Sequence, residues 1–390
     1  MPAPPVADAT ARDTAAVAPR APATRHVPEL DGLRALAIWA VLGAHLFFTW
    51  PATHESSAFL PVPLAAAIGH GWLGVDLFFV LSGYLITSIL LRTKTGGRGA
   101  YFSRFYLHRV TRILPLYFAV LLVLFVCFHG RYGAFFALCA LMAGNLATLF
   151  NIPIPDAAGP FWSLAVEEQF YLVWPWLVLA LDARRLAWVA GAVLVIEPFV
   201  RIGAHGHDLE LTWFRADGLA MGAFLAAWFA TWTGDPRKAR DLALVLLAVA
   251  AAVTLAGVSL GTMHESVVAG TSLRITQAIF VFGAVLVAAV AYSGRPWLAF
   301  MRSPATTVTA LLSYCLYLVH KPISDTFAWA YAKTPFAASL APVPTLAVRV
   351  VCVLALAYGV AALSRRFLER PFIALGHRSE LAGKLSEGRL

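Results

Sequence analysis

The sequence predicts an all-α, polytopic integral membrane protein, a bundle of about ten transmembrane helices with both termini in the cytoplasm. Three observations predict this fold class. The 390 residues are 60% hydrophobic and only 13% charged, which is too apolar for a soluble domain of this size. Apolar runs long enough to cross a bilayer recur along the chain. Lys and Arg gather in short segments between those runs, so the net charge of +9 indicates membrane topology and not nucleic-acid binding.

Composition divides the chain into three parts. Residues 1–28 are rich in Pro and Ala and lack a helical period, so we expect a disordered cytoplasmic tail. Residues 29–373 form the predicted membrane domain, and residues 374–390 form a second cytoplasmic tail. Eleven apolar segments follow the first tail, at 31–50, 69–91, 113–129, 132–150, 164–181, 186–202, 213–232, 241–260, 274–293, 306–324 and 345–363.

The loop charges reduce eleven segments to ten crossings. The basic connections are 91–112, 182–185, 233–240, 293–302 and 364–370, and the connections poor in Lys and Arg are 151–160, 203–212, 261–266 and 333–344. All basic loops are cytoplasmic only if the chain crosses an odd number of times between residues 113 and 150. Two apolar runs flank HGRYG there, so we expect one of them to be re-entrant, interfacial or fused into a bent span.

The first apolar segment carries two ionisable residues, Arg34 and His45. Eleven positions correspond to about 16.5 Å along a helix and to within about 20° of three full turns. The two side chains therefore share one helix face, with Arg34 toward the cytoplasm and His45 toward the outside.

Further ionisable residues fall near the outer ends of their predicted spans. These are Asp76, Glu167, Glu168, Arg215, Asp217 and His320. A single such group can simply pair with another helix, but each costs about 2.5–3.5 kcal/mol or more at depth, so several that converge indicate a functional site.

A second group lies on the inner side. Arg104, His108, Arg109 and Arg112 precede the third span, and Arg109 and Arg112 share a helix face. Arginine binds phosphates bidentately, so we expect an anionic donor here, although basic residues beside a membrane often only set topology. No GXXXXGK[ST] loop occurs, which excludes a P-loop nucleotide-hydrolysing motor, and the four scattered cysteines show no metal-site spacing.

This polarity suggests group transfer across the bundle. A phosphate-bearing donor would bind the inner arginines, and its long thin arm would bridge the distance from Arg34 to His45. His45 would take a proton from an acceptor hydroxyl, with Glu167 or Asp217 orienting its ring.

Seven segments, in order from residue 29 to residue 373, resemble acyltransferase family 3, the integral membrane O-acyltransferases of bacterial glycans. They are ELDGLRALAIWAVLGAH, GWLGVDLFFVLSGYLIT, YLHRVTRILPLYF, FWSLAVEEQFYLVWP, FRADGLAMG, SYCLYLVHKPI and RRFLERPF. The resemblance implies a protein of the bacterial cytoplasmic membrane. It also implies acyl transfer from cytosolic acyl-CoA, usually acetyl-CoA, to a hydroxyl of a surface glycan or a lipid-linked sugar.

The resemblance also implies roles for single residues. His45 is the expected catalytic base or acyl relay, and Glu167 is the carboxylate of the WSLxxE segment. Arg109 and Arg112 handle acyl-CoA together with Arg34. The remaining motif residues are Tyr317, His320 and Glu369, and the last of these lies on the cytoplasmic side, where pairing with Arg109 or Arg112 is an alternative to action on the acceptor.

This sequence departs from the family pattern at two residues and in its C-terminal end, and one alternative function stays open. Cys315 and His108 stand where the family more often has Gly or Pro and Arg. The sequence ends soon after the last span, without the extracytoplasmic domain fused to some members, so either His45 hands the acyl group outward or a separate acyltransferase partner receives it. The alternative is a transporter or flippase of a glycan precursor, which would show inverted repeats. None is visible in this sequence.

Overall fold

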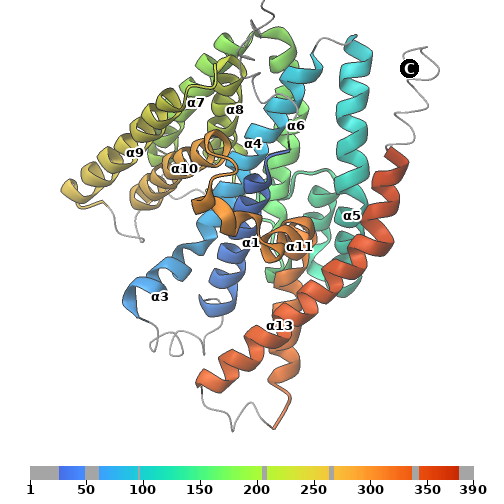
Figure 1. The fold of residues 1–390 in the computed structure, drawn as a ribbon. Coiled ribbons are helices and arrows are strands. Elements are labelled where there is room, and N and C mark those ends of the chain that lie inside the picture. Colours follow the sequence, from blue (N-terminus) through green and yellow to red (C-terminus); the bar gives the residue numbers. More distant parts are fainter. Residues whose placement is uncertain are drawn as a thin grey trace, which may run out of the picture.

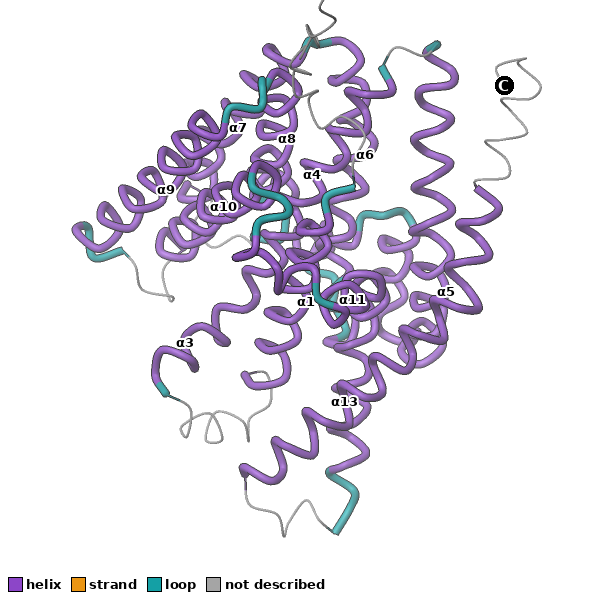
Figure 2. The backbone as a smooth tube through the Cα atoms, viewed as in Figure 1, coloured by secondary structure: helices purple, strands orange, loops and turns teal. Residues whose placement is uncertain are grey.

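The computed structural model describes residues 26–48, 61–94, 97–203, 209–262, 268–335 and 342–376. The two predicted tails fall almost wholly outside these ranges and stay predictions. Figures 1 and 2 show a chain that is helical nearly throughout the described part, with short loops between helices. The α-helices are α1 (Pro28–Phe48), α3 (Val62–Gly69), α4 (Gly74–Thr93), α5 (Arg98–Ala140), α6 (Phe161–Ala180), α7 (Ala183–Gly203), α8 (Ala216–Thr231), α9 (Pro236–Ser259), α10 (Val268–Ala291), α11 (Pro304–Tyr331) and α13 (Pro342–Ser364).

Short helical turns join several of these helices. They are the 3₁₀ segments η2 (His70–Leu73), η3 (Gly144–Phe150), η4 (Asp156–Ala158), η5 (Thr212–Phe214) and η6 (Pro296–Arg302), and the π-helical segment η7 (Arg365–Glu369). The chain returns to α-helix after η7 and continues to Gly376.

Seven helical stretches of the described residues are long and apolar enough to cross a membrane. They are Pro28–Phe47, Val62–Thr93, Arg98–Ala140, Ala183–Gly203, Pro236–Ser259, Val268–Ala291 and Val343–Gly376. α8 is apolar but shorter, whereas α6 and α11 carry the Glu, His, Lys and Asp side chains of two predicted motifs. The predicted class, an all-α polytopic membrane bundle, is confirmed.

α5 contains the apolar run 113–129 and the first part of the run 132–150, and its chain turns back on itself between them. The Tyr117 hydroxyl donates a hydrogen bond to the Cys139 carbonyl at 2.8 Å, and the Phe125 and Phe136 ring centroids lie 5.7 Å apart. In a straight helix residues 117 and 139 would be separated by about 33 Å. The reversal falls at HGRYG, residues 129–133, so the two runs are fused into one bent helix, which is one of the three forms that the sequence predicts.

α4 and α8 approach one another at glycines. A methyl group on Gly83 of α4 would overlap the Leu219 carbonyl, and one on Gly222 of α8 would overlap the Val80 carbonyl. Gly218 lies one turn before Gly222 and faces Phe79. Small residues four apart let membrane helices approach at backbone distance, so this spacing explains the close α4–α8 pair.

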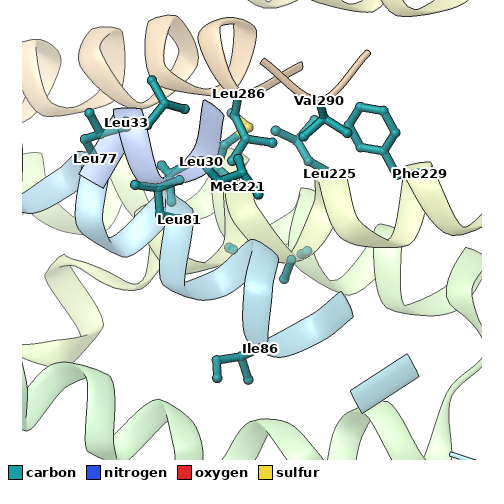
Figure 3. Packing of buried hydrophobic residues seen from close by; sticks show 14 of the residues in the cluster. Leu30, Leu33, Leu77, Leu81, Ile86, Met221, Leu225, Phe229, Leu286 and Val290 are labelled. Atoms are coloured by element: carbon teal, nitrogen blue, oxygen red, sulfur yellow. The ribbon is translucent and has the colours of Figure 1, made fainter. Parts of the chain in front are cut away.

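α1 and α4 contribute to both large hydrophobic clusters of the bundle, as do α5, α6 and α8. One cluster joins α1, α4, α8 and α10 through residues such as Leu33, Leu81, Met221 and Leu286, as Figure 3 shows. The other joins the same two helices to α5, α6, α11 and α13. α1 and α4 therefore run through the middle of the bundle (Figure 1), and α1 carries both Arg34 and His45.

We expect Gly222→Ala to destabilise the protein by about 1–3 kcal/mol, because the added methyl has no room between the α4 and α8 backbones. Equilibrium unfolding of the purified protein in mixed micelles measures the effect. The matched control is Gly359→Ala on α13, where a methyl meets no atom within 4 Å and helix propensity adds up to about 1 kcal/mol. Equal behaviour of the two variants would contradict the packing argument.

Candidate active site

A cavity of about 140 Å³ lies between α1, α4, α5, α6 and α11. Its charged lining is Arg34, Arg109, Arg112 and Glu167. Its polar lining is Ser82, Ser163, Tyr171, Ser313, Tyr314 and Tyr317, and the rest is aliphatic or phenylalanine. The structure thus brings the three predicted donor-binding arginines into one cavity, together with a carboxylate that the sequence placed nearer His45.

One stripe of α6 faces this cavity. Ser163, Glu167 and Tyr171 are four residues apart and so lie on one helix face. The Tyr171 hydroxyl donates to Glu167 at 3.1 Å, and Ser82 of α4 completes the chain by donating to the Tyr171 hydroxyl at 2.6 Å. Glu167 is therefore held from two helices. Tyr171 was missed from the sequence, although the four-residue spacing from Glu167 is the signal that finds it.

The arginines keep capacity for an anion. Arg34 forms an ion pair of 3.1 Å with Asp31, one turn earlier on α1. The Arg109 guanidinium lies 5.4 Å from the centroid of the Tyr171 ring, and its buried Nε has no hydrogen-bond partner among the described residues. Arg112 is exposed and lines the same cavity. Three cations beside one carboxylate make this wall electropositive, as a phosphate site requires.

The inner end of α1 is fixed by Glu29, which is fully buried. Its carboxylate accepts hydrogen bonds from the Gly294 amide at 2.8 Å, the Ser293 hydroxyl at 2.7 Å and the Arg302 guanidinium at 2.5 Å. These contacts tie α1 to the loop between α10 and α11, and so set the position of Arg34, one and a half turns further along.

His45 and His320 form a pair beyond Tyr317, with ring centroids 4.9 Å apart. His45 Nδ1 lies 2.9 Å from the Val41 carbonyl, and His320 Nδ1 lies 2.7 Å from the Tyr317 carbonyl. A carbonyl only accepts, so Nδ1 carries the hydrogen in both rings, and each neutral imidazole keeps a basic lone pair on Nε2. The buried His320 Nε2 has no hydrogen-bond partner in the described part of the chain.

Tyr317 joins the cavity to the histidine pair. Ser163 donates to the Pro160 carbonyl at 3.1 Å, so the Tyr317 hydroxyl donates to Ser163 Oγ at 2.6 Å. The Tyr317 ring lines the cavity, and its centroid lies 5.8 Å from that of His320. A continuous row of side chains thus runs from the arginines through Tyr317 and His320 to His45.

A family model described as an acyltransferase domain matches residues 27–364. The chain belongs to acyltransferase family 3. Similar curated proteins include the peptidoglycan O-acetyltransferase OatA of Listeria monocytogenes, 33% identical over 46% of this chain and 28% of that protein. They also include the putative peptidoglycan O-acetyltransferase YrhL of Bacillus subtilis, 34% identical over 39% and 23%, and a putative O-acetyltransferase of Staphylococcus aureus, 30% identical over 40% and 25%.

These alignments span about a quarter of the length of the curated relatives. No solved structure matches the chain. Family membership therefore rests on the match to most of the membrane domain.

In this acyltransferase-family chain, three predicted supporting residues belong to a separate buried ion-pair network. Arg215 donates to Asp76 at 2.8 Å, and Arg201 pairs with Asp217 at 2.6 Å and with Glu197 at 3.5 Å. The sequence predicted that Asp217 or Glu167 orients His45, but the structure pairs Asp217 with Arg201 and Glu167 with Tyr171.

Arg201 and Glu197 were missed because both lie within an apolar run read as a plain span. Arg201 also donates to the Phe214 carbonyl at 3.0 Å and to Ser272 at 3.1 Å. It therefore ties α7 to α8 and α10. Arg215 in turn lies 5.1 Å from the Trp162 ring, next to Ser163 on α6, so the network supports the cavity wall from behind.

Two further residues, Glu369 of η7 and Arg349 of α13, are compared with the sequence predictions. Glu369 accepts from Ser364 at 3.2 Å and pairs with Arg365 at 3.6 Å. The sequence offered pairing with Arg109 or Arg112 as an alternative role; the ion pair that Glu369 forms is the local one with Arg365, and Arg112 is near enough to act on its charge. Arg349, missed from the sequence, is buried and donates to the His45 carbonyl at 3.3 Å and to Ser324 at 2.9 Å. Its position within an apolar run, near the predicted outer end, is the sequence signal that could have identified it.

Asp217→Asn should lower the free energy of unfolding by about 3 kcal/mol or more, because it leaves Arg201 in an apolar setting with one acidic partner fewer. Unfolding in mixed micelles measures the loss. The control is Asp241→Asn, which breaks the exposed pair with Arg240 and should cost less than about 1 kcal/mol. If the two losses are equal, the network does not stabilise the bundle.

Proposed function

We propose that the chain is a membrane O-acetyltransferase that moves an acetyl group from cytosolic acetyl-CoA to a hydroxyl of a cell-surface glycan. One observation carries the proposal: an arginine-lined cavity continues through Tyr317 to a histidine pair. Family membership and the O-acetyltransferase names of the relatives support the reaction class.

The donor binds through its phosphates. Arg112, exposed at the cavity, and Arg109 and Arg34 within it supply the positive charge for the anionic end of acetyl-CoA. Beyond the arginines the cavity is lined by serine and tyrosine hydroxyls and by aliphatic and phenylalanine side chains, which suits the thin arm of the donor.

His45 acts on the acceptor hydroxyl. Its Nε2 takes the hydroxyl proton while the oxygen attacks the acetyl carbonyl carbon. The new C–O bond forms, the C–S bond of the thioester breaks, and the departing sulfur leaves with the electron pair. Alternatively, Nε2 itself accepts the acetyl group first and passes it to the hydroxyl as an acyl relay.

Glu167 serves the donor side of the reaction. Its carboxyl group lines the cavity, where the thioester arm would lie, and is held there by Tyr171. We assign it the proton that the departing CoA sulfur takes up. His45 returns to its starting state when it releases its proton to water. Glu167 returns to its starting state when it takes up a proton from water.

The acceptor is a cell-wall or other surface glycan, the class that the names of two relatives indicate for those proteins. The chain either acetylates the glycan directly from His45 or hands the acetyl group to a separate extracytoplasmic acyltransferase. Asp76, Arg215 and Asp217 have the supporting role of holding α4, α7 and α8 in place.

We infer ten crossings of the bacterial cytoplasmic membrane with both termini inside, formed by α1, α4, α5, α6, α7, α8, α9, α10, α11 and α13. Figure 1 supports this, because the α4–α5 and α6–α7 connections and the C-terminal end of α13 lie toward the top, whereas α3 and the start of α13 lie toward the bottom. The top connections are the basic ones.

Reporter fusions test this topology. Alkaline phosphatase, active only outside the cytoplasm, should be active when fused after residue 155 and inactive after residue 237, since the bent α5 crosses once. A green fluorescent protein fusion should give the reverse. A cytoplasmic residue 155 would refute the ten-crossing arrangement.

His45→Ala should lower acetyl transfer by about 10²–10⁴-fold, the usual contribution of a positioned base, and leave acetyl-CoA binding intact. Arg109→Gln should weaken acetyl-CoA binding by about tenfold or more. Transfer of radiolabelled acetyl groups to cell-envelope glycan and calorimetric binding of acetyl-CoA separate the two effects. The control is His70→Ala, outside the cavity, which should retain activity.

Two results would overturn the proposal. Full glycan acetylation by His45→Ala would remove the catalytic role of the histidine pair. Loss of glycan export with acetylation retained would favour a transporter.

A further inference from the structure

A groove outside the active site runs between the cytoplasmic ends of α11 and α13. It encloses about 530 Å³ and combines an apolar floor with a rim of three arginines. The floor is formed by Val308, Leu311, Leu312 and Ala362, and the rim by Arg365, Arg366 and Arg370.

The π-helical segment explains why three arginines share one groove. Arg365 and Arg370 are five residues apart and would lie about 140° from each other around an α-helix. The segment Arg365–Glu369 is π-helical, and its wider turn closes after five residues, so both side chains come near the same face. Arg366 and Arg370 are four apart and already share a face.

The charge in this groove is only partly compensated. Arg365 pairs with Glu369 at 3.6 Å, and its buried Nε has no hydrogen-bond partner among the described residues. Arg366 contacts the face of the Phe367 ring, 5.3 Å from its centroid. The side chains of Arg366 and Arg370 are exposed. With one carboxylate for three guanidinium groups, the rim attracts an anion.

The floor indicates what kind of anion binds. Val308 and Leu311 are each 51% exposed on the outer surface of the bundle, where hydrocarbon and not water is the surrounding medium. A ligand that covers this floor and reaches the arginines must join an alkyl chain to a negative headgroup. A soluble phosphate compound would leave the floor uncovered.

We propose that the α11–α13 groove is a binding site for an anionic phospholipid of the inner leaflet, with the phosphate on Arg366 and Arg370 and an acyl chain along Leu311. Basic pockets between helices on the cytoplasmic side have the chemistry to hold such headgroups. The site is independent of the acetyl-transfer proposal, since none of its residues lines the arginine cavity.

The test uses the full-length protein, purified in a neutral detergent and stripped of lipid. Phosphatidylglycerol or phosphatidylcholine is titrated in, with bound lipid counted by native mass spectrometry and stability followed by thermal shift. Phosphatidylglycerol should bind the wild type and raise its melting temperature more than phosphatidylcholine does. The double variant R366Q/R370Q should require about 30-fold more phosphatidylglycerol for half saturation, from about a five- to sixfold loss per cation.

Three further variants sharpen the result. R366K/R370K keeps the charge and should keep most of the binding. R237Q/K238Q at the start of α9 removes two cytoplasmic cations away from the groove and should leave the titration unchanged. Leu311→Gln alters only the floor and should weaken phosphatidylglycerol binding.

The proposal is overturned if R366Q/R370Q binds phosphatidylglycerol as the wild type does, or if both lipids bind equally. Coenzyme A is titrated in parallel without lipid. If it binds through Arg366 and Arg370 and Leu311→Gln has no effect on any ligand, the groove is a nucleotide site and the lipid assignment fails.

Discussion

A charge inside a membrane bundle must be neutralised by another group, because the lipid core offers neither water nor counter-ions. In this protein three arginines share a cavity with a single lining carboxylate. Arg112 is exposed at this cavity, so water and anions can compensate the excess positive charge there. That constraint underlies the proposed reaction, in which an anionic donor binds the arginines from the cytoplasm and the acyl group moves away from them.

Arginine and carboxylate side chains on α7 and α8 have a different role, because there they neutralise one another. Arg201 uses its guanidinium on two carboxylates, two hydroxyls and a carbonyl, which leaves nothing for a ligand. Arg109 makes ring contacts instead and keeps a buried nitrogen without a partner in the described residues. Hydrogen-bond saturation therefore separates Arg201, whose role is structural, from Arg109, for which we propose donor binding.

The sequence alone predicted those features of the site that the geometry of a single helix determines. The shared face of Arg34 and His45 and the Arg109–Arg112 spacing follow from 3.6 residues per turn, whereas the Tyr317–His320 pair came from the family resemblance. The sequence alone did not predict the pairing of Asp217 with Arg201 or the position of Glu167 beside the arginines, because these depend on how separate helices are rotated and packed. Loop charge alone predicted that the two apolar runs between residues 113 and 150 do not form two separate crossings, but it left open whether one run is re-entrant, interfacial or fused into a bent span.

The Tyr317–Ser163 hydrogen bond lies between the arginine cavity and the histidine pair. A membrane that maintains a proton gradient cannot contain an open aqueous path, so an enzyme that works on substrates from both faces needs a permeability barrier at its own centre. In the proposed reaction Tyr317 stands at that point, with its hydroxyl bound to Ser163. Acyl transfer past this ring and the electrical integrity of the membrane would then place demands on the same side chain.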